Sequence, residues 1–219
     1  MLADGGMVIA WWLIVQALGW TAWPLAFRAL RWLPDRGYML AKPLGLLLVS
    51  YMLWLLASLR VLPNNLLGIA VAWLIVAAVG LIVYRRRSSL DDSLLATLRQ
   101  HARLLVAYEV LFAVALIAWV IFRAHVPDAV SGEKPMELTF FNAIARSDFF
   151  PPHDPWLAGF NIAYYYFGYV MLSLLRQVSG AGAGVTLSLG TALWFALTAA
   201  GAFAVVANLV LLLRARLCL

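Results

Sequence analysis

Residues 61–84 read VLPNNLLGIAVAWLIVAAVGLIVY and contain no charged side chain. A helix that crosses a bilayer needs about 20 predominantly apolar residues, so this run is long enough to cross once. Residues 104–122 form a similar run, in which Glu109 is the only charged residue. The chain therefore predicts several membrane-spanning helices. Further charge-free runs cover residues 5–27, 43–59, 155–175 and 177–213.

The composition of the whole chain indicates the same environment. Of its 219 residues, 65% are hydrophobic and 12% are charged, and the mean hydropathy is +0.91. A soluble domain carries charge on about a quarter of its residues, so this chain cannot cover itself with water-compatible side chains. We expect an all-α, polytopic transmembrane helix bundle of about six spans in the cytoplasmic membrane of the cell. The expected spans are residues 7–27, 44–60, 64–84, 104–122, 160–178 and 185–213.

The basic residues predict how the bundle is oriented. The net charge of +6 does not indicate nucleic-acid binding, because the basic residues gather between apolar spans and form no groove with interleaved aromatic residues. Lys and Arg are enriched in cytoplasmic connections. This bias places both termini and a long loop, residues 123–162, outside the cytoplasm, although Arg214 and Arg216 argue the other way. The residues counted as cytoplasmic are Arg28, Arg31, Arg36, Lys42, Arg85, Arg86, Arg87, Arg99, Arg103 and Arg176.

This topology divides the chain into two parts. Residues 1–103 hold spans 1–3 and a basic cytoplasmic loop, and residues 104–219 hold span 4, the external loop and spans 5 and 6. Cys218 is the only cysteine, which excludes an internal disulfide and a cysteine-based metal site.

Glu109 lies inside span 4, where an ionisable side chain is functional by default. We favour a structural role, because the carboxylate could pair with Arg103 or His101, or form a bond across helices. Apart from Arg60 and Arg176, which lie at the ends of two spans, no other charged residue falls within the spans, and no inverted repeat is visible, so the pattern disfavours a secondary transporter.

The external loop is the polar part of the chain, since five of the ten acidic residues fall within residues 123–166. Pro135 suits the first turn of a helix, and a helix from Pro135 to about Phe149 places Glu137 and Asp148 on its apolar stripe. This pattern is typical of an amphipathic helix at the membrane interface. Glu137 either serves chemistry or is an acid that the helix dipole favours in the first turn. For Asp148 the pattern favours a solvated or capping role.

Three prolines, Pro151, Pro152 and Pro155, stiffen the segment after this helix, because proline fixes φ and donates no backbone hydrogen bond. They display His153 and Asp154 on a rigid backbone, which suits binding or acid–base chemistry. Alternatively, Asp154 caps backbone N–H groups in a structural turn. The pair alone does not define a metal site, and it leaves a divalent cation open as a cofactor. The tyrosines of residues 164–166 taken alone indicate an aromatic belt at the membrane interface.

Several motifs of this region occur together and resemble the YYY family, whose members are large bacterial and archaeal membrane proteins with a domain of unknown function, named for a triple tyrosine. Family members are usually several times longer, so we expect this chain to be an N-terminal portion of such a protein. The matching motifs are residues 34–38 (PDRGY), 41–45 (AKPLG), 132–137 (GEKPME), 141–144 (FNAI), 151–152 (PP), 154–159 (DPWLAG) and 164–168 (YYYFG).

The YYY family is in turn similar to the GT-C membrane glycosyltransferases, which carry an acidic residue in their first large external loop. The resemblance implies that Glu137 is the general base that deprotonates an acceptor hydroxyl. Asp154 would be the second catalytic carboxylate and would position, with His153, the acceptor or a cation. The donor would be a polyprenyl-phosphate-linked sugar that enters from the bilayer. The substrate contacts that the resemblance implies are Glu133, Lys134, Arg146, His153, Trp156, Tyr164, Tyr165 and Tyr166.

Two functions from different classes follow. The first is a GT-C-like glycosyltransferase module at the non-cytoplasmic face, in which Lys134 or Arg146 offsets the donor phosphate. The second is a non-catalytic membrane scaffold, or a module that binds glycans or lipid headgroups. The lipid bilayer is a partner in both.

Overall fold

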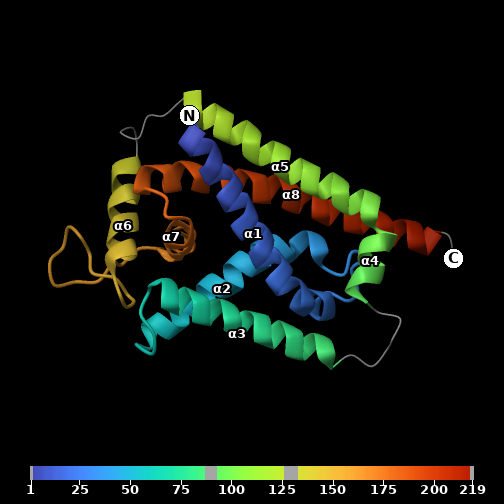
Figure 1. Ribbon diagram of the computed structural model, residues 1–219, viewed down its shortest axis with the longest axis horizontal. Helices are drawn as coiled ribbons and strands as arrows, with labels where there is room; N and C mark the ends of the chain where they lie inside the picture. The colour runs from blue at the N-terminus through green and yellow to red at the C-terminus, as the bar shows by residue number, and fades with distance from the viewer. Residues whose placement is uncertain (1, 87–92, 126–132, 218–219) are drawn as a thin grey trace.

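The computed structural model describes residues 2–86, 93–125 and 133–217, and the regular elements within these ranges are helices (Figure 1). Arg87, Gly132 and Cys218 lie outside the described residues. The predicted all-α fold is confirmed. The elements are α1 (Leu2–Ala29), η1 (Tyr38–Leu40), α2 (Ala41–Ser58), α3 (Leu66–Arg85), α4 (Leu94–Gln100), α5 (Ala102–His125), α6 (Lys134–Arg146), α7 (Phe167–Ser179) and α8 (Ala183–Leu217).

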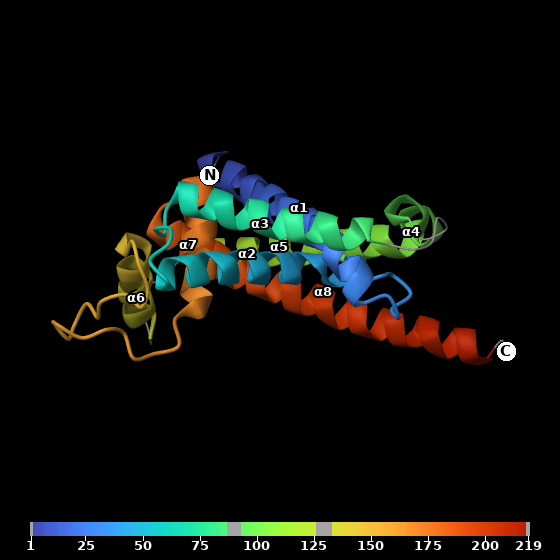
Figure 2. The same ribbon diagram turned by 90° about the horizontal axis from the view of Figure 1, so that it is seen from below.

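Five long helices form the bundle. The helices α1, α2 together with η1, α3, α5 and α8 are each long and apolar enough to cross a membrane. Figures 1 and 2 show that they run back and forth along one common direction. The protein is thus a multi-pass membrane protein, with five candidate spans among the described residues where the sequence predicts about six.

The predicted span over residues 160–178 is wrong. Its helical part is α7, which has 13 residues and is therefore about 20 Å long at 1.5 Å per residue. The hydrocarbon core of a bilayer is about 30 Å thick, so α7 is too short to cross it. Figure 1 looks down the axis of α7 while the five long helices lie across the view, so α7 runs transverse to the bundle. Gly180, with a φ of 72°, ends α7 in the left-handed conformation that glycine permits.

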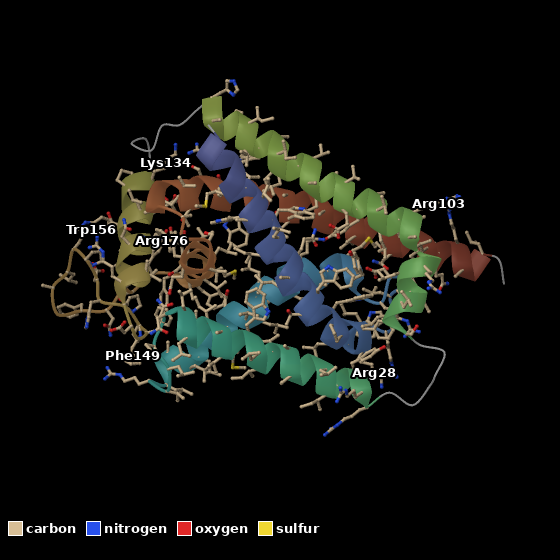
Figure 3. The ribbon with its side chains drawn as sticks, in the orientation of Figure 1. Arg28, Arg103, Lys134, Phe149, Trp156 and Arg176 are labelled. Atoms are coloured by element: carbon tan, nitrogen blue, oxygen red, sulfur yellow. The ribbon has the colours of Figure 1, made fainter. Side chains whose placement is uncertain are left out.

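The two ends of the bundle differ. One end, called the loop end, holds the turn between α2 and α3, the helices α6 and α7, and residues 147–166 (Figures 1 and 2). The other, called the basic end, holds the connection between α1 and α2, helix α4 and the last turns of α8. Figure 3 places Lys134 and Trp156 at the loop end, and Arg28 and Arg103 at the basic end. The termini lie at opposite ends of the bundle, which differs from the expected placement of both on one side.

Helix α1 packs closely against α2. A Cβ atom at Gly45 of α2 would lie 2.1 Å from the carbonyl oxygen of Leu18, so only glycine fits this crossing. Small residues permit such approaches between membrane helices. Near the start of α1, Trp11 donates a hydrogen bond from Nε1 to Ser179 Oγ at 3.0 Å. This bond ties the end of the transverse helix α7 to the bundle.

A buried polar cluster joins α1, α2 and α5. Glu109 forms an ion pair with Lys42, and its carboxylate also accepts hydrogen bonds from Tyr38 Oη at 3.0 Å and from Gln16 Nε2 at 2.7 Å. Lys42 is only 3% exposed, and its ammonium lies 4.5 Å from the centroid of the Tyr108 ring. The expected bond of Glu109 across helices is confirmed, whereas Arg103 and His101 are not its partners. Paired charges of this kind hold membrane helices in register.

The turn between α2 and α3 fixes the end of α6. The Asn64 side-chain amide donates to the carbonyl oxygens of Ile144 and Ser147, both at 3.1 Å, and its backbone N–H donates to the Asp148 carbonyl at 2.7 Å. Helix α6 accordingly ends at Arg146, three residues before the predicted end. Asp148 lies outside the helix and is exposed, which agrees with the expected solvated role.

Candidate functional site

Helix α6 places Glu137 at the edge of the bundle. Pro135 stands at the start of the helix, as predicted, and Glu137 lies in the first turn. Phe141 and Ile144, on the same stripe, are completely buried, whereas Glu137 is partly buried. The predicted amphipathic helix is therefore confirmed, and its apolar stripe packs on the bundle with one carboxylate at the margin.

Glu137 lines a cavity of about 190 Å³ that α6, α7 and the first half of α8 enclose together with the end of α5. Lys134, one turn before Glu137, and Arg123, near the end of α5, bring two positive charges to the same cavity. Figure 3 shows Lys134 at the start of α6, close to the first turns of α8. The remaining wall is mostly apolar and carries three hydroxyl groups, those of Tyr169, Ser188 and Thr191. It consists of Leu138, Tyr169, Leu172, Gly184, Leu187, Ser188, Thr191 and Trp194.

The electrostatics of this cavity favour an anionic ligand beside a carboxylate. The Nε atom of Arg123 is buried and has no hydrogen-bond partner among the described residues. A buried guanidinium N–H without a partner is costly unless a ligand accepts from it. Burial, followed by the negative charge of Glu137, raises the pKa of Tyr169 to about 12. Its phenol is therefore a weaker acid than an ordinary tyrosine, and at physiological pH the neutral O–H can donate a hydrogen bond.

The proline-rich loop after α6 is a closed structural turn. The Asp154 Oδ1 atom accepts hydrogen bonds from the backbone N–H groups of Trp156 at 2.8 Å and Leu157 at 3.0 Å. Backbone bonds from Asp154 N to Phe160 O and from Ile162 N to Pro152 O close the loop on itself. The capping interpretation of Asp154 is confirmed.

Neither Asp154 nor His153 lines the cavity of Glu137. His153 is exposed and faces Asn161 in an isolated bridge. Over the described ranges, no three His, Cys, Asp or Glu side chains come close enough together to hold a metal ion.

The model of DUF2298, a family described as uncharacterized membrane protein, matches residues 48–219. The chain belongs to the DUF2298 family. The match begins inside α2 and includes every residue that lines the cavity of Glu137. No curated protein matches the chain, and no solved structure matches it.

The expectation of a membrane-protein family with a domain of unknown function is thus confirmed over residues 48–219. The match does not extend to residues 34–45, where two of the quoted motifs lie. The match also gives no evidence of a likeness to the GT-C glycosyltransferases, and that likeness remains a prediction.

The tyrosine triplet of this DUF2298 chain divides into two roles. Tyr166 is half-buried and its hydroxyl accepts a hydrogen bond from Trp54 Nε1 at 3.0 Å, so it attaches the start of α7 to α2. Tyr164 and Tyr165 stack with ring centroids 3.9 Å apart and share a hydrogen bond of 2.6 Å between their hydroxyls. Tyr165 is 78% exposed, so this pair forms a surface feature.

An aromatic row leads from the loop to this tyrosine pair. Trp156, which is 60% exposed, lies 5.2 Å from Phe140 of α6, measured between ring centroids. Phe140 in turn lies 5.6 Å from Tyr164. Glu133, at the N-cap position of α6, is exposed, and its charge contributes to the raised pKa of Tyr169. The row therefore contacts α6 at Phe140, at the same end of the bundle as the cavity.

Arg146 is far from the cavity that Lys134 lines. The two residues stand at opposite ends of α6, twelve positions and about 18 Å apart along the axis, so they cannot hold one phosphate together. Arg146 instead lines a separate open recess of about 350 Å³ with Arg176. The Arg176 guanidinium lies 5.5 Å from the centroid of the Phe141 ring.

Sequence reasoning missed Arg123 and Tyr169 as residues of the site. Arg123 follows the charge-poor span that α5 forms, and Tyr169 follows the YYYFG motif by one residue. A basic residue directly after an apolar span is usually interpreted as an anchor at the membrane interface, so the sequence alone did not indicate a role for Arg123 in the site. Only the fold brings the end of α5 next to α6 and α7.

Proposed function

We propose that this DUF2298 protein is a membrane-embedded transferase that moves a sugar from a polyprenyl-phosphate donor to an acceptor hydroxyl at the loop end. The observation that carries the proposal is the position of Glu137 in a cavity that it shares with the side chains of Arg123 and Lys134. A carboxylate beside two cations fits a reaction in which a proton leaves one substrate and a phosphate leaves the other.

In the proposed step, Glu137 takes the proton of the acceptor hydroxyl, and the oxygen attacks the anomeric carbon of the donor sugar. The bond from that carbon to the phosphate oxygen breaks, and the bonding electrons stay on the polyprenyl phosphate. Arg123 and Lys134 stabilise the charge that develops on this leaving group, because preorganised cations act strongly at a site with little water. Leu172, Leu187 and Trp194 supply the apolar wall for the first isoprene units.

The distribution of basic residues supports a non-cytoplasmic position for the loop end. With five spans, eleven of the sixteen Lys and Arg residues belong in sequence to the connections and helix ends of the basic end, and such an excess marks the cytoplasmic side. Arg214 and Arg216, which argue against a six-span topology, agree with this one. The basic residues at the loop end are Arg60, Arg123, Lys134, Arg146 and Arg176.

Trp156 and Tyr165, the exposed members of the aromatic row, support a saccharide acceptor, whereas Phe140 is buried. Exposed aromatic faces pack on the C–H face of a sugar ring, and tyrosine hydroxyls can bond to its hydroxyl groups. In this arrangement Trp156 and the tyrosine pair hold the acceptor, and Glu137 meets its reactive hydroxyl.

The test is transfer of radiolabelled sugar from polyprenyl-phosphate donors by the full-length protein in membrane vesicles. We expect Glu137→Gln to lower turnover by about 10²–10⁴-fold, the usual contribution of a general base, without lowering the amount of folded protein. Asp148→Asn is the matched control, because it neutralises an exposed carboxylate at the same end, outside the cavity. Equal transfer by wild type and Glu137→Gln would remove Glu137 from the mechanism.

A second candidate is a non-catalytic module that binds glycans or lipid headgroups. The capping role of Asp154 favours this candidate, because Asp154 is then not available as a second catalytic carboxylate. Glu137 is the only acidic side chain among the described residues lining the cavity. Under this alternative the wild type retains polyprenyl phosphate but transfers no sugar from any donor, and Glu137→Gln changes retention alone. Measuring both sugar transfer and polyprenyl-phosphate retention in the wild type and in Glu137→Gln therefore distinguishes the two functions.

A further inference from the structure

A second, larger cavity of about 450 Å³ lies at the basic end, away from the cavity of Glu137. Its walls come from the connection after α1, from α4 with the residue before it, and from the last turns of α8. Figure 1 shows these segments next to one another at the end where the C-terminus lies.

The charge of this cavity is positive. Arg31, Arg36 and His101 contribute to its lining, and none of the described lining residues is acidic. Asp35, between the two arginines in sequence, is completely buried. Its carboxylate accepts hydrogen bonds from the backbone N–H groups two and four residues further on, at 3.1 and 2.8 Å. It is therefore committed to the turn that presents the arginines.

Part of the lining of the cavity is apolar. Trp32, Leu211 and Leu212 line it, and the apolar segments of α1 and α8 end close by, at Ala29 and Ala215. The cavity thus lies where the hydrocarbon core of the bilayer meets the headgroups. Trp32 is 64% exposed, and tryptophan favours this depth because its ring is apolar while its N–H seeks water. A matching ligand combines an anionic group with apolar chains.

We infer that this cavity binds the phosphate group of an anionic phospholipid from the adjacent leaflet. The guanidinium groups of Arg31 and Arg36 contact the phosphate, since a guanidinium matches two phosphate oxygens at once. The acyl chains follow Trp32 and the side chains of Leu211 and Leu212 into the bilayer. A soluble phosphate would leave that apolar wall without a partner. The site does not depend on the proposed transfer reaction.

The experiment is native mass spectrometry of the full chain, exchanged into detergent with equal amounts of phosphatidylglycerol and phosphatidylcholine. We expect wild-type protein to retain phosphatidylglycerol in preference, and Arg31→Gln to lower its retention about fivefold, the effect of one interfacial basic residue. Arg103→Gln is the matched control, because Arg103 is exposed at the same end and does not line the cavity. It should leave retention within twofold of wild type.

Every outcome of these measurements either supports the lipid site or overturns it. Equal losses in Arg31→Gln and Arg103→Gln would show a general charge effect and overturn the site. Displacement of the lipid by millimolar glycerol 3-phosphate would overturn the assignment to a lipid, since it would mean that the headgroup alone suffices. Arg31→Lys preserves the charge and should recover most of the retention. If Arg31→Gln does not fold, His101→Gln tests the same wall, and unchanged lipid preference there would contradict the inference.

Discussion

Two regions of the bundle each combine a glutamate, a lysine and a tyrosine. In one region the three side chains contact one another, and in the other they line a cavity. Between α1, α2 and α5, Glu109 is bonded directly to Lys42 and to a tyrosine hydroxyl, and the cluster is closed by aromatic rings. At the loop end, Glu137, Lys134 and Tyr169 line a cavity. The same three residue types thus serve a structural contact in one place and face an open volume in the other. Residue type does not separate these roles, whereas the space next to the carboxylate does.

The largest effect on stability should come from breaking the closed cluster. Lys42→Met leaves Glu109, whose side chain is 25% exposed, without its cation. Loss of one partner of a fully buried pair costs about 3–5 kcal/mol, so this is the upper limit of the expected loss. Lys134→Met removes the equivalent lysine from the open region, where an exposed or half-exposed pair contributes roughly 0–1 kcal/mol. We expect thermal unfolding in detergent to show this difference directly.

The double variant Lys42→Met with Glu109→Gln is the control for the first prediction. It removes both charges, so it should recover much of the stability that Lys42→Met loses. Equal losses in the single and the double variant would mean that packing of the lysine side chain, rather than the unpaired charge, causes the effect. Equal stability of Lys42→Met and Lys134→Met would contradict the comparison itself.

Most of the fold could be predicted from apolar runs, because membrane-spanning helices must satisfy their backbone hydrogen bonds internally. The runs containing residues 61–84 and 104–122 become α3 and α5 within a few residues. The run over residues 155–175 has the same length and lacks charge, but its first part folds as the Asp154 turn. Absence of charge therefore indicates an apolar environment, and local turn geometry decides whether the chain crosses the bilayer there.

The candidate site was less predictable than the fold. Helical spacing placed Glu137 on the apolar stripe of α6, and the cavity contains it. The resemblance to the GT-C glycosyltransferases, and not helical spacing, joined Arg146 to this site, although twelve positions on a helix separate it from Lys134. Arg123 depends on a contact between segments that are distant in sequence, which local patterns do not encode.

A smaller effect should separate the turn of Asp154 from the cavity. Asp154→Ala removes the acceptor for two backbone N–H groups, and a hydrogen bond of this kind contributes about 0.5–1.5 kcal/mol. We expect faster hydrogen exchange at the amides of Trp156 and Leu157, with sugar transfer lowered less than tenfold. Glu137→Gln should show the reverse pattern. Loss of transfer in Asp154→Asn with unchanged exchange would return Asp154 to a catalytic role.

The smallest effect concerns the coupling of Tyr169 to Glu137. Burial comes first and the carboxylate of Glu137 second among the causes that raise the pKa of this phenol from 10.0 to about 12. The raised value favours the neutral phenol in the folded protein, so its contribution to stability is complete below pH 10 and is lost as the pH rises toward 12. Removing the negative charge in Glu137→Gln should shift the titration of Tyr169 toward lower pH.

Ultraviolet difference titration at alkaline pH can measure this shift. The curve of wild type minus that of Tyr169→Phe isolates the ionisation of Tyr169, and the same subtraction in the Glu137→Gln background gives its value without the carboxylate. Because burial is the larger cause, the midpoint should move only part of the way toward 10. An unchanged midpoint would mean that the charge of Glu137 does not reach the phenol. The cavity would then not bring the two groups into one electrostatic environment, and its likeness to the closed cluster of Glu109 would be one of composition alone.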